Sequence, residues 1–91
     1  MEETILDIVR ARLNRAQCDR ALDDYLLARI RAAIAELGDK GITAADTPRD
    51  CVLVADLVAW EYQSRDKPGG MPDWLRLMIR ERWLAEKEGK T

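Results

Sequence analysis

Apolar residues recur at intervals of three and four along the whole chain, and they nowhere alternate with polar residues as they would in a half-buried strand. Leucine, alanine, arginine and glutamate, which all favour helix, dominate these stretches. The chain has 91 residues, which is room for one hydrophobic core. We therefore expect an all-α fold, a single small domain of about four helices.

The ends of the helices are marked by capping residues and by breaks in the pattern. Asp23 suits the N-cap of the second helix, and Gly38 suits a left-handed cap at its end, after which Ile42 turns back toward the helix. Thr47 followed by Pro48 is typical of the start of the third. We expect the second and third helices to form the central antiparallel pair. The predicted helices span about residues 3–13, 23–37, 48–64 and 72–88, with a loop at 65–71.

The third predicted helix is apolar on two opposite sides. Leu53, Leu57 and Trp60 share one side, opposite the side that carries Cys51 and Val54. Either this helix lies at the centre of the monomer between neighbours, or one of its sides belongs to a partner chain.

The second predicted helix carries a strip of small residues that includes Ala28 and Ala32. Such a strip would let another helix approach closely. It is also what a solvated helix surface looks like, because alanine is the best helix former.

The composition argues against catalysis and metal binding. The chain has no histidine and a single serine, which excludes serine–histidine triads and imidazole zinc sites. Cys18 and Cys51 are too few for a four-thiolate zinc site or a disulfide scaffold, and no histidine is present to activate them. The carboxylate pairs stand where helix starts favour acids. We therefore predict no enzyme and no catalytic, cofactor-binding or metal-binding residue.

The charge is nearly balanced, with 15 basic and 17 acidic residues. No global positive field draws the chain to nucleic acid, so any contact with DNA must be local. The fourth predicted helix carries Arg76, Arg80, Trp83 and Lys87 on one face. This basic face could contact phosphates or the acidic rim of a partner, or it could simply be solvated.

We expect a cytosolic chain that does not cross a membrane. No apolar stretch approaches the length of a membrane span, because a charged residue recurs every few positions. The N-terminus also lacks a basic segment followed by an apolar run.

A pattern of spaced apolar residues covers about residues 5–64. Its members are Ile5, Leu6 and Leu13, then Leu22 to Leu27, Ile30, Ala33 and Leu37, then the Gly41-Ile42 turn, and Tyr62 near the end of a capped helix. This pattern resembles the short all-helical head-tail connector proteins of tailed phages and prophages, also called adaptor or DNA-packaging connector proteins. The resemblance does not extend to the helix from Met71 onward.

The resemblance implies a subunit that assembles as a homo-oligomeric ring below the portal, extends the DNA channel and docks the next neck or tail protein. Its implied partners are further copies of itself, the portal protein, a neck or tail completion protein, and DNA that passes without sequence-specific binding. It implies no membrane, no small-molecule substrate and no catalysis. The subunit would lie in the host cytoplasm during assembly and then in the virion neck.

The site residues follow from these faces. For contacts between subunits the candidates are Ala28, Ala32, Leu53, Leu57 and Trp60. For contacts with a partner or with DNA they are Arg76, Arg80, Trp83 and Lys87.

Two other functions remain open. One is a small helical DNA-binding regulator, with the fourth helix as recognition helix and its basic side chains on phosphates. The other is a partner-binding helical bundle, such as an assembly chaperone or an inhibitor, for which Leu53, Leu57 and Trp60 would form the binding site.

Overall fold

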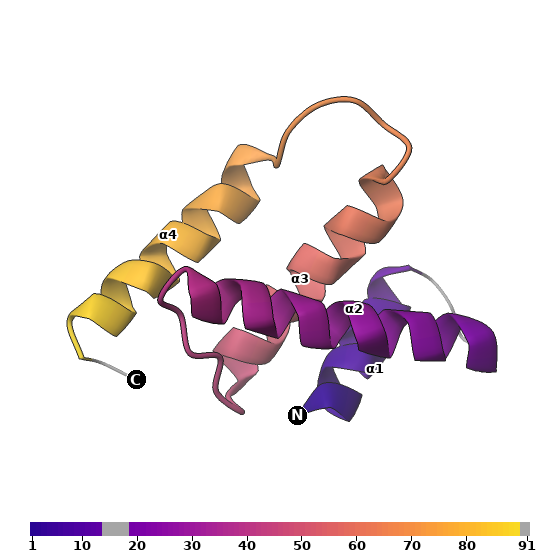
Figure 1. Cartoon of the computed structure of the whole chain (residues 1–91), viewed down its shortest axis with the longest axis horizontal. Coiled ribbons are helices and arrows are strands. Elements are labelled where there is room, and N and C mark those ends of the chain that lie inside the picture. The colour runs from indigo at the N-terminus through magenta and orange to yellow at the C-terminus, as the bar shows by residue number, and fades with distance from the viewer. Residues whose placement is uncertain (14–18, 90–91) are drawn as a thin grey trace.

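The computed structural model describes residues 1–13 and 19–89, and over these ranges it contains four α-helices and no strand (Figure 1). The domain measures 40 × 30 × 19 Å, so it is about two helix layers thick. The predicted all-α single domain is confirmed. The helices are α1 (Glu2–Arg12), α2 (Arg20–Asp39), α3 (Pro48–Ser64) and α4 (Asp73–Lys87).

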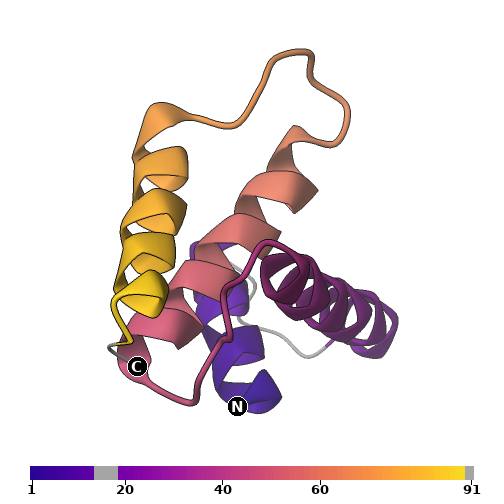
Figure 2. The same ribbon diagram turned by 60° about the vertical axis from the view of Figure 1, so that its left-hand side comes forward.

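Helix α3 lies at the centre of the domain. Helices α1, α2 and α4 all contact it, and the contacts with α1 are the most extensive. Figures 1 and 2 show α2 crossing α3 at a steep angle instead of running antiparallel beside it. The prediction of a central antiparallel pair is therefore wrong. Three helices share the surface of α3, so no single neighbour can lie along its whole length.

The predicted start and end of α3 are confirmed, whereas α2 is longer than predicted. The hydroxyl of Thr47 accepts a hydrogen bond from the backbone N–H of Asp50 (3.3 Å), as an N-cap should. In α2 this role belongs to Asp19, whose carboxylate accepts from the backbone N–H of Leu22 (3.2 Å). Asp23 therefore lies inside the helix and not at its N-cap.

The turn after α2 is a Schellman motif. Ile42 N–H donates to the carbonyl of Leu37 (2.8 Å), and Gly41 N–H donates to the carbonyl of Gly38 (3.0 Å). Gly41 has a φ of 91°, so it adopts the left-handed conformation that the sequence pattern assigned to Gly38. The predicted return of Ile42 is confirmed, because its side chain is buried in the core.

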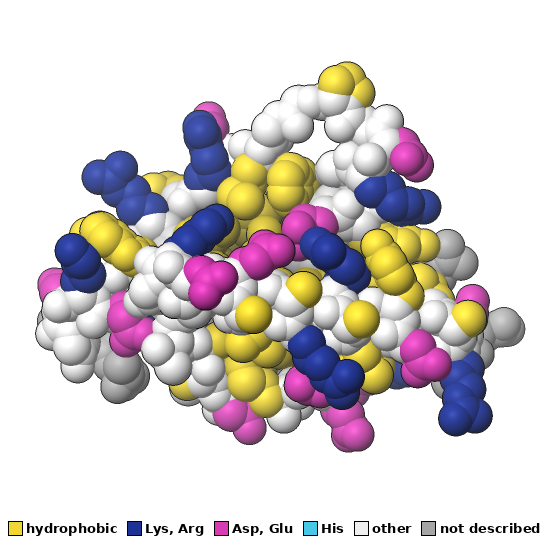
Figure 3. Space-filling view, in the orientation of Figure 1, with side chains coloured by type: hydrophobic (Ala, Val, Ile, Leu, Met, Phe, Trp, Pro, Cys, Tyr) yellow, Lys and Arg dark blue, Asp and Glu magenta, His cyan; other side chains and the backbone are white. Residues whose placement is uncertain are grey.

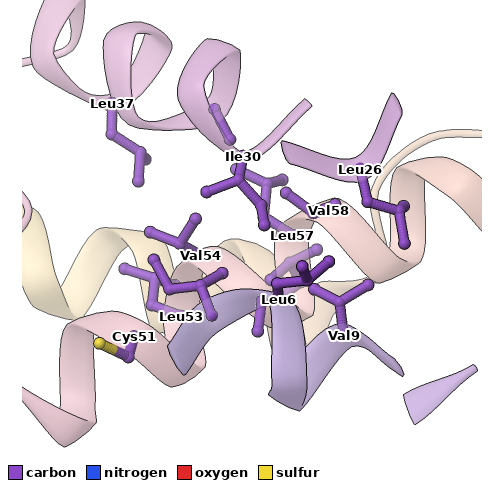
Figure 4. Close-up of a cluster of buried hydrophobic side chains, with 14 of the residues drawn as sticks. Leu6, Val9, Leu26, Ile30, Leu37, Cys51, Leu53, Val54, Leu57 and Val58 are labelled. Carbon is purple, nitrogen blue, oxygen red and sulfur yellow. The ribbon is translucent and has the colours of Figure 1, made fainter. Parts of the chain in front are cut away.

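The core forms around α3, as Figure 4 shows. Leu53 and Leu57 are only 3% and 5% exposed and belong to this core. Of the two arrangements left open by the sequence, α3 thus adopts the first and is packed between neighbours. The largest fully buried side chains are Ile5, Val9, Leu26, Ile30, Leu37, Ile42, Val54, Val58 and Leu75.

Arginine–carboxylate ion pairs also join the packed helices. The carboxylates of Asp23, Asp50 and Asp56 are buried, and each of them accepts an arginine from another helix. Every helix pair in close contact has at least one arginine–carboxylate bridge, and α1 and α2 have a second between Glu2 and Arg31. The other bridges include Arg10–Asp23 between α1 and α2, Arg12–Asp56 between α1 and α3, Arg29–Glu61 between α2 and α3, and Arg82–Asp50 between α3 and α4.

Candidate functional site

One face of α4 is anchored on the domain by a buried arginine. Arg82 is 4% exposed, and its Nε donates to Oδ1 of Asp50 (2.9 Å). Its Nη2 donates to the carbonyl oxygen of Thr43 (2.9 Å). The hydrogen bond to Asp50 raises the pKa of Arg82 above its ordinary value. Leu75, seven residues earlier on the same face, is also buried, so this face of α4 is the one held against the domain.

Asp50 has a structural role that the sequence did not reveal. It stands at the start of α3, where acids are common, but its carboxylate accepts from the backbone N–H of Ala45 (2.8 Å) as well as from Arg82. The sequence reasoning also missed Arg82. The available signal was its place on the same helical face as Leu75, since an arginine there must meet a buried acceptor.

An open groove of about 420 Å³ lies between α4 and the turn that follows α2. We call it the basic groove. Its floor is apolar, with Ile42 buried and Ile79 half-buried. On the face shown in Figure 3, yellow apolar surface lies between α4 and α2, with both dark blue and magenta side chains at its edges. The residues that line the basic groove are Lys40, Ile42, Met71, Arg76, Ile79, Arg80 and Trp83.

The charged side chains around the basic groove are all positive. Lys40, Arg76 and Arg80 are exposed, and no acidic residue lines the groove. Arg76 forms an ion pair with Asp73 (2.7 Å) that is open to water and therefore weak. Arg80 has no ion pair within residues 1–13 and 19–89. The groove therefore offers an apolar floor with a cationic rim.

Trp83 forms one wall of the basic groove and packs against the turn after α2. A Cβ atom added at Gly41 would lie 3.5 Å from Nε1 of the indole, so the ring covers this glycine. The Nζ of Lys87 lies 4.6 Å from the ring centroid, in cation–π contact. Three of the four residues predicted to share the basic face therefore line the groove. Arg76, Arg80 and Trp83 line the groove, while Lys87 caps the indole.

The outer side of α4 carries a second exposed surface. Trp74, Leu77 and Leu84 are 45%, 55% and 44% exposed, and Glu81 lies between the two leucines on the same side. The guanidinium of Arg12 on α1 lies 5.8 Å from the ring centroid of Trp74, so this indole also contacts the rest of the domain. We call Trp74, Leu77, Glu81 and Leu84 the α4 stripe. At 100° per residue its mean direction lies roughly 130° around the helix axis from that of the groove-lining residues of α4. The sequence placed Trp74 and Leu77 on the apolar surface of α4 but did not separate the side that packs from the side that is exposed.

The predicted subunit contacts need correction. Leu53 and Leu57 are in the monomer core, so neither has surface to offer a partner. Trp60 is half-buried against the core, and Ala32 is half-buried on α2. Ala28, also on α2, is exposed.

A smaller hollow of about 360 Å³ lies beside Trp60. Within it, Oε2 of Glu61 accepts from Arg29 (2.8 Å), whereas Oε1 is buried and has no hydrogen-bond partner among the described residues. Burial raises the pKa of Glu61. The guanidinium of Arg65 lies 4.3 Å from the ring centroid of Tyr62 in the wall, so part of this hollow is already occupied by the chain itself.

The thiol of Cys51 is buried on the inward side of α3, as predicted. Burial, together with the nearby carboxylate of Asp46, raises its pKa. Cys18 lies outside the described residues.

Residues 1–13 and 19–89 contain neither a cluster of metal ligands nor a membrane-spanning helix. No group of three acidic or cysteine side chains is arranged to hold a metal ion. None of the helices is long and apolar enough to cross a membrane.

Comparison with known proteins identifies no relative that could assign this surface. No protein-family model matches the chain, and no curated protein or solved structure shows significant similarity to it.

Proposed function

We propose that this chain is a non-catalytic assembly protein, a head-tail connector subunit that forms a ring below the portal, extends the DNA channel and docks the next neck or tail protein. The observation that carries the proposal is the α4 stripe. It presents three large apolar side chains, each about half exposed, on one side of a helix whose opposite side is anchored.

Such a surface favours a protein partner. Single exposed leucines are ordinary, but here Trp74, Leu77 and Leu84 follow one another along about 15 Å of helix. Contiguous apolar surface rimmed by polar residues is typical of interfaces between proteins. Tryptophan is also enriched among the residues that contribute most to binding.

The role as a connector subunit is supported by the resemblance to connector proteins and by the ion pairs of the buried aspartates. The connector-like pattern covers about residues 5–64, which corresponds to the body formed by α1, α2 and α3. In this body Asp23, Asp50 and Asp56 are each engaged by an arginine, as in a structural framework. Helix α4 would then be the element through which the body makes its contacts.

The test is the molar mass in solution, measured by size-exclusion chromatography with light scattering over a wide range of protein concentration. We expect a discrete species of many subunits. The variant Leu77→Lys should run as a monomer with an unchanged circular dichroism spectrum, because the side chain is exposed. The matched control is Val52→Lys, which places the same charge at an exposed apolar position on α3 and should leave assembly intact.

A wild-type monomer at every concentration would contradict self-assembly into a ring. It would favour the partner-binding bundle, whose site would then be the α4 stripe.

A DNA-binding regulator remains the second candidate, because Lys40, Arg76 and Arg80 gather around one groove. Gel shifts with duplex DNA at low salt distinguish the two. Salt-sensitive binding that is lost in Arg76→Glu/Arg80→Glu would favour the regulator. We expect no shift, because the floor of the groove is apolar and the chain is net acidic.

A further inference from the structure

We propose that the occupant of the basic groove is a second copy of this chain, which inserts its α4 stripe. Each subunit would then contact the next head to tail. The inference rests on the proposed function, because it names the two surfaces that make the contact between subunits.

The two surfaces match in polarity. The floor of the basic groove offers the half-buried side chains of Met71 and Ile79 between charged side chains, whereas Ile42 is buried. The α4 stripe is a convex helix side on which Leu77 and Leu84 stand about two turns apart. Helices commonly dock in this way, with an apolar side laid into an apolar groove.

The two surfaces also match in charge. Two exposed acids near α4 fall on the side of the stripe: by helical periodicity Glu81 and Glu88 lie in the same arc as Leu77 and Leu84. The charged residues that line the groove are all cations, and one of them, Arg76, is already paired with Asp73 of its own helix. Neither Glu81 nor Arg80 has an ion pair within the described part of the subunit, so both charges are available to a neighbouring copy.

The placement of the two surfaces prevents a subunit from filling its own groove and makes the contact between subunits head to tail. The α4 stripe and the basic groove lie on different sides of the same helix, so a subunit cannot insert its own stripe into its own groove. A contact between two unlike surfaces repeats with a constant rotation, which generates a ring when the rotation closes.

The charges also argue against a symmetric dimer through the stripe alone. Packing stripe against stripe would bring Glu81 and Glu88 of one copy toward the same acids of the other. Such like-charge contacts oppose association, whereas stripe on groove brings acids to a cationic rim.

The experiment uses two full-length variants, each with one surface disabled. The groove variant is Arg76→Glu/Arg80→Glu, and the stripe variant is Leu77→Gln/Leu84→Gln. All four side chains are exposed, and each replacement keeps a good helix former, so both variants should fold. Circular dichroism and thermal unfolding check this directly.

Each variant alone should be a monomer by light scattering, because every head-to-tail contact would include a disabled surface. An equimolar mixture should give a 1:1 heterodimer with twice the monomer mass and nothing larger. The intact stripe of the groove variant meets the intact groove of the stripe variant, while the two disabled surfaces cannot extend the chain.

The other outcomes separate this inference from the proposed function. If the wild type assembles and either variant still assembles alone, the contact between subunits does not use these two surfaces, while the proposed ring is not contradicted. A groove variant that dimerises by itself would indicate stripe-to-stripe contact and overturn the inference. Two monomeric variants that form no heterodimer when mixed would overturn the inference as well. A monomeric wild type would refute both proposals.

Discussion

Arg82 and Asp50 show how much of this fold depends on single side-chain pairs. Both are nearly inaccessible to water, and their ion pair is what ties α4 to α3. The partners are 32 residues apart in the sequence. Helical periodicity indicates that Arg82 faces inward. Which acid it pairs with depends on how α4 packs on α3, and the spacing of residues along one helix carries no information about that packing.

Replacing Arg82 with methionine should destabilise the protein by about 3 kcal/mol, because it leaves the Asp50 carboxylate buried without its cation. Urea unfolding followed by circular dichroism measures the change. The control is Arg80→Met on the same helix, whose exposed side chain should change the free energy of unfolding little. Equal losses of unfolding free energy in the two variants would show that the buried Arg82–Asp50 pair is not the cause of the destabilisation.

Glu61 predicts a pH dependence of stability. Burial raises its pKa in the folded state, so its ionised form destabilises the fold at pH values above that folded pKa. This unfavourable contribution disappears as the pH falls through the folded pKa toward the unfolded value. Glu61→Gln should therefore raise the thermal unfolding midpoint at neutral pH, and its advantage should shrink as the pH falls.

Thermal scans of wild type and variant at several pH values test this. An advantage that stays constant with pH would show that the charge of Glu61 is not responsible.

At the scale of helices, the sequence predicted most where the signals are local. Thr47 and Pro48 define the start of α3 because capping involves only neighbouring residues. Two aspartates could cap α2, and Asp19 does so while Asp23 pairs with Arg10 of another helix. That choice depends on tertiary packing, so the sequence pattern alone assigned the wrong aspartate.

The same limit applies to the basic groove. Spacing along α4 correctly placed Arg76 and Arg80 on one side. It could not supply Lys40 and Ile42, which come from the end of α2 and the turn after it. It also could not show that the α3 leucines are used inside the monomer, because an apolar side looks the same whether a neighbouring helix or a partner covers it.

Gly38 and Gly41 provide a matched test of the turn after α2. Gly41→Ala should destabilise the protein by about 1–2 kcal/mol, because its φ of 91° is unfavourable for alanine. Gly38 lies within α2 and has open space around it, so Gly38→Ala should stabilise by about 0.5–1 kcal/mol. Chemical denaturation of both variants measures this, and effects of the same sign would contradict the assignment of the left-handed residue.

At the scale of the whole molecule, the packing is uneven. Helices α1, α2 and α3 all contact one another, whereas among the helices α4 packs closely with α3 alone. Because local opening is easiest where few contacts hold an element, α4 should be the least stable helix of the isolated subunit.

Hydrogen exchange followed by mass spectrometry should show faster exchange in α4 than in α3. If α4 makes the contact between subunits, its protection should rise with protein concentration while that of α3 changes less. Uniform protection across the four helices would contradict this uneven stability.

The three tryptophans also give the molecule three separate optical reporters. Trp74 belongs to the exposed α4 stripe, Trp83 forms a wall of the basic groove, and Trp60 packs against the core. Emission from Trp74 would shift to shorter wavelength when the stripe leaves water, and that from Trp83 would respond to occupation of the groove. Variants that retain one indole each would therefore report docking, groove filling and unfolding as three distinct signals, without any added dye.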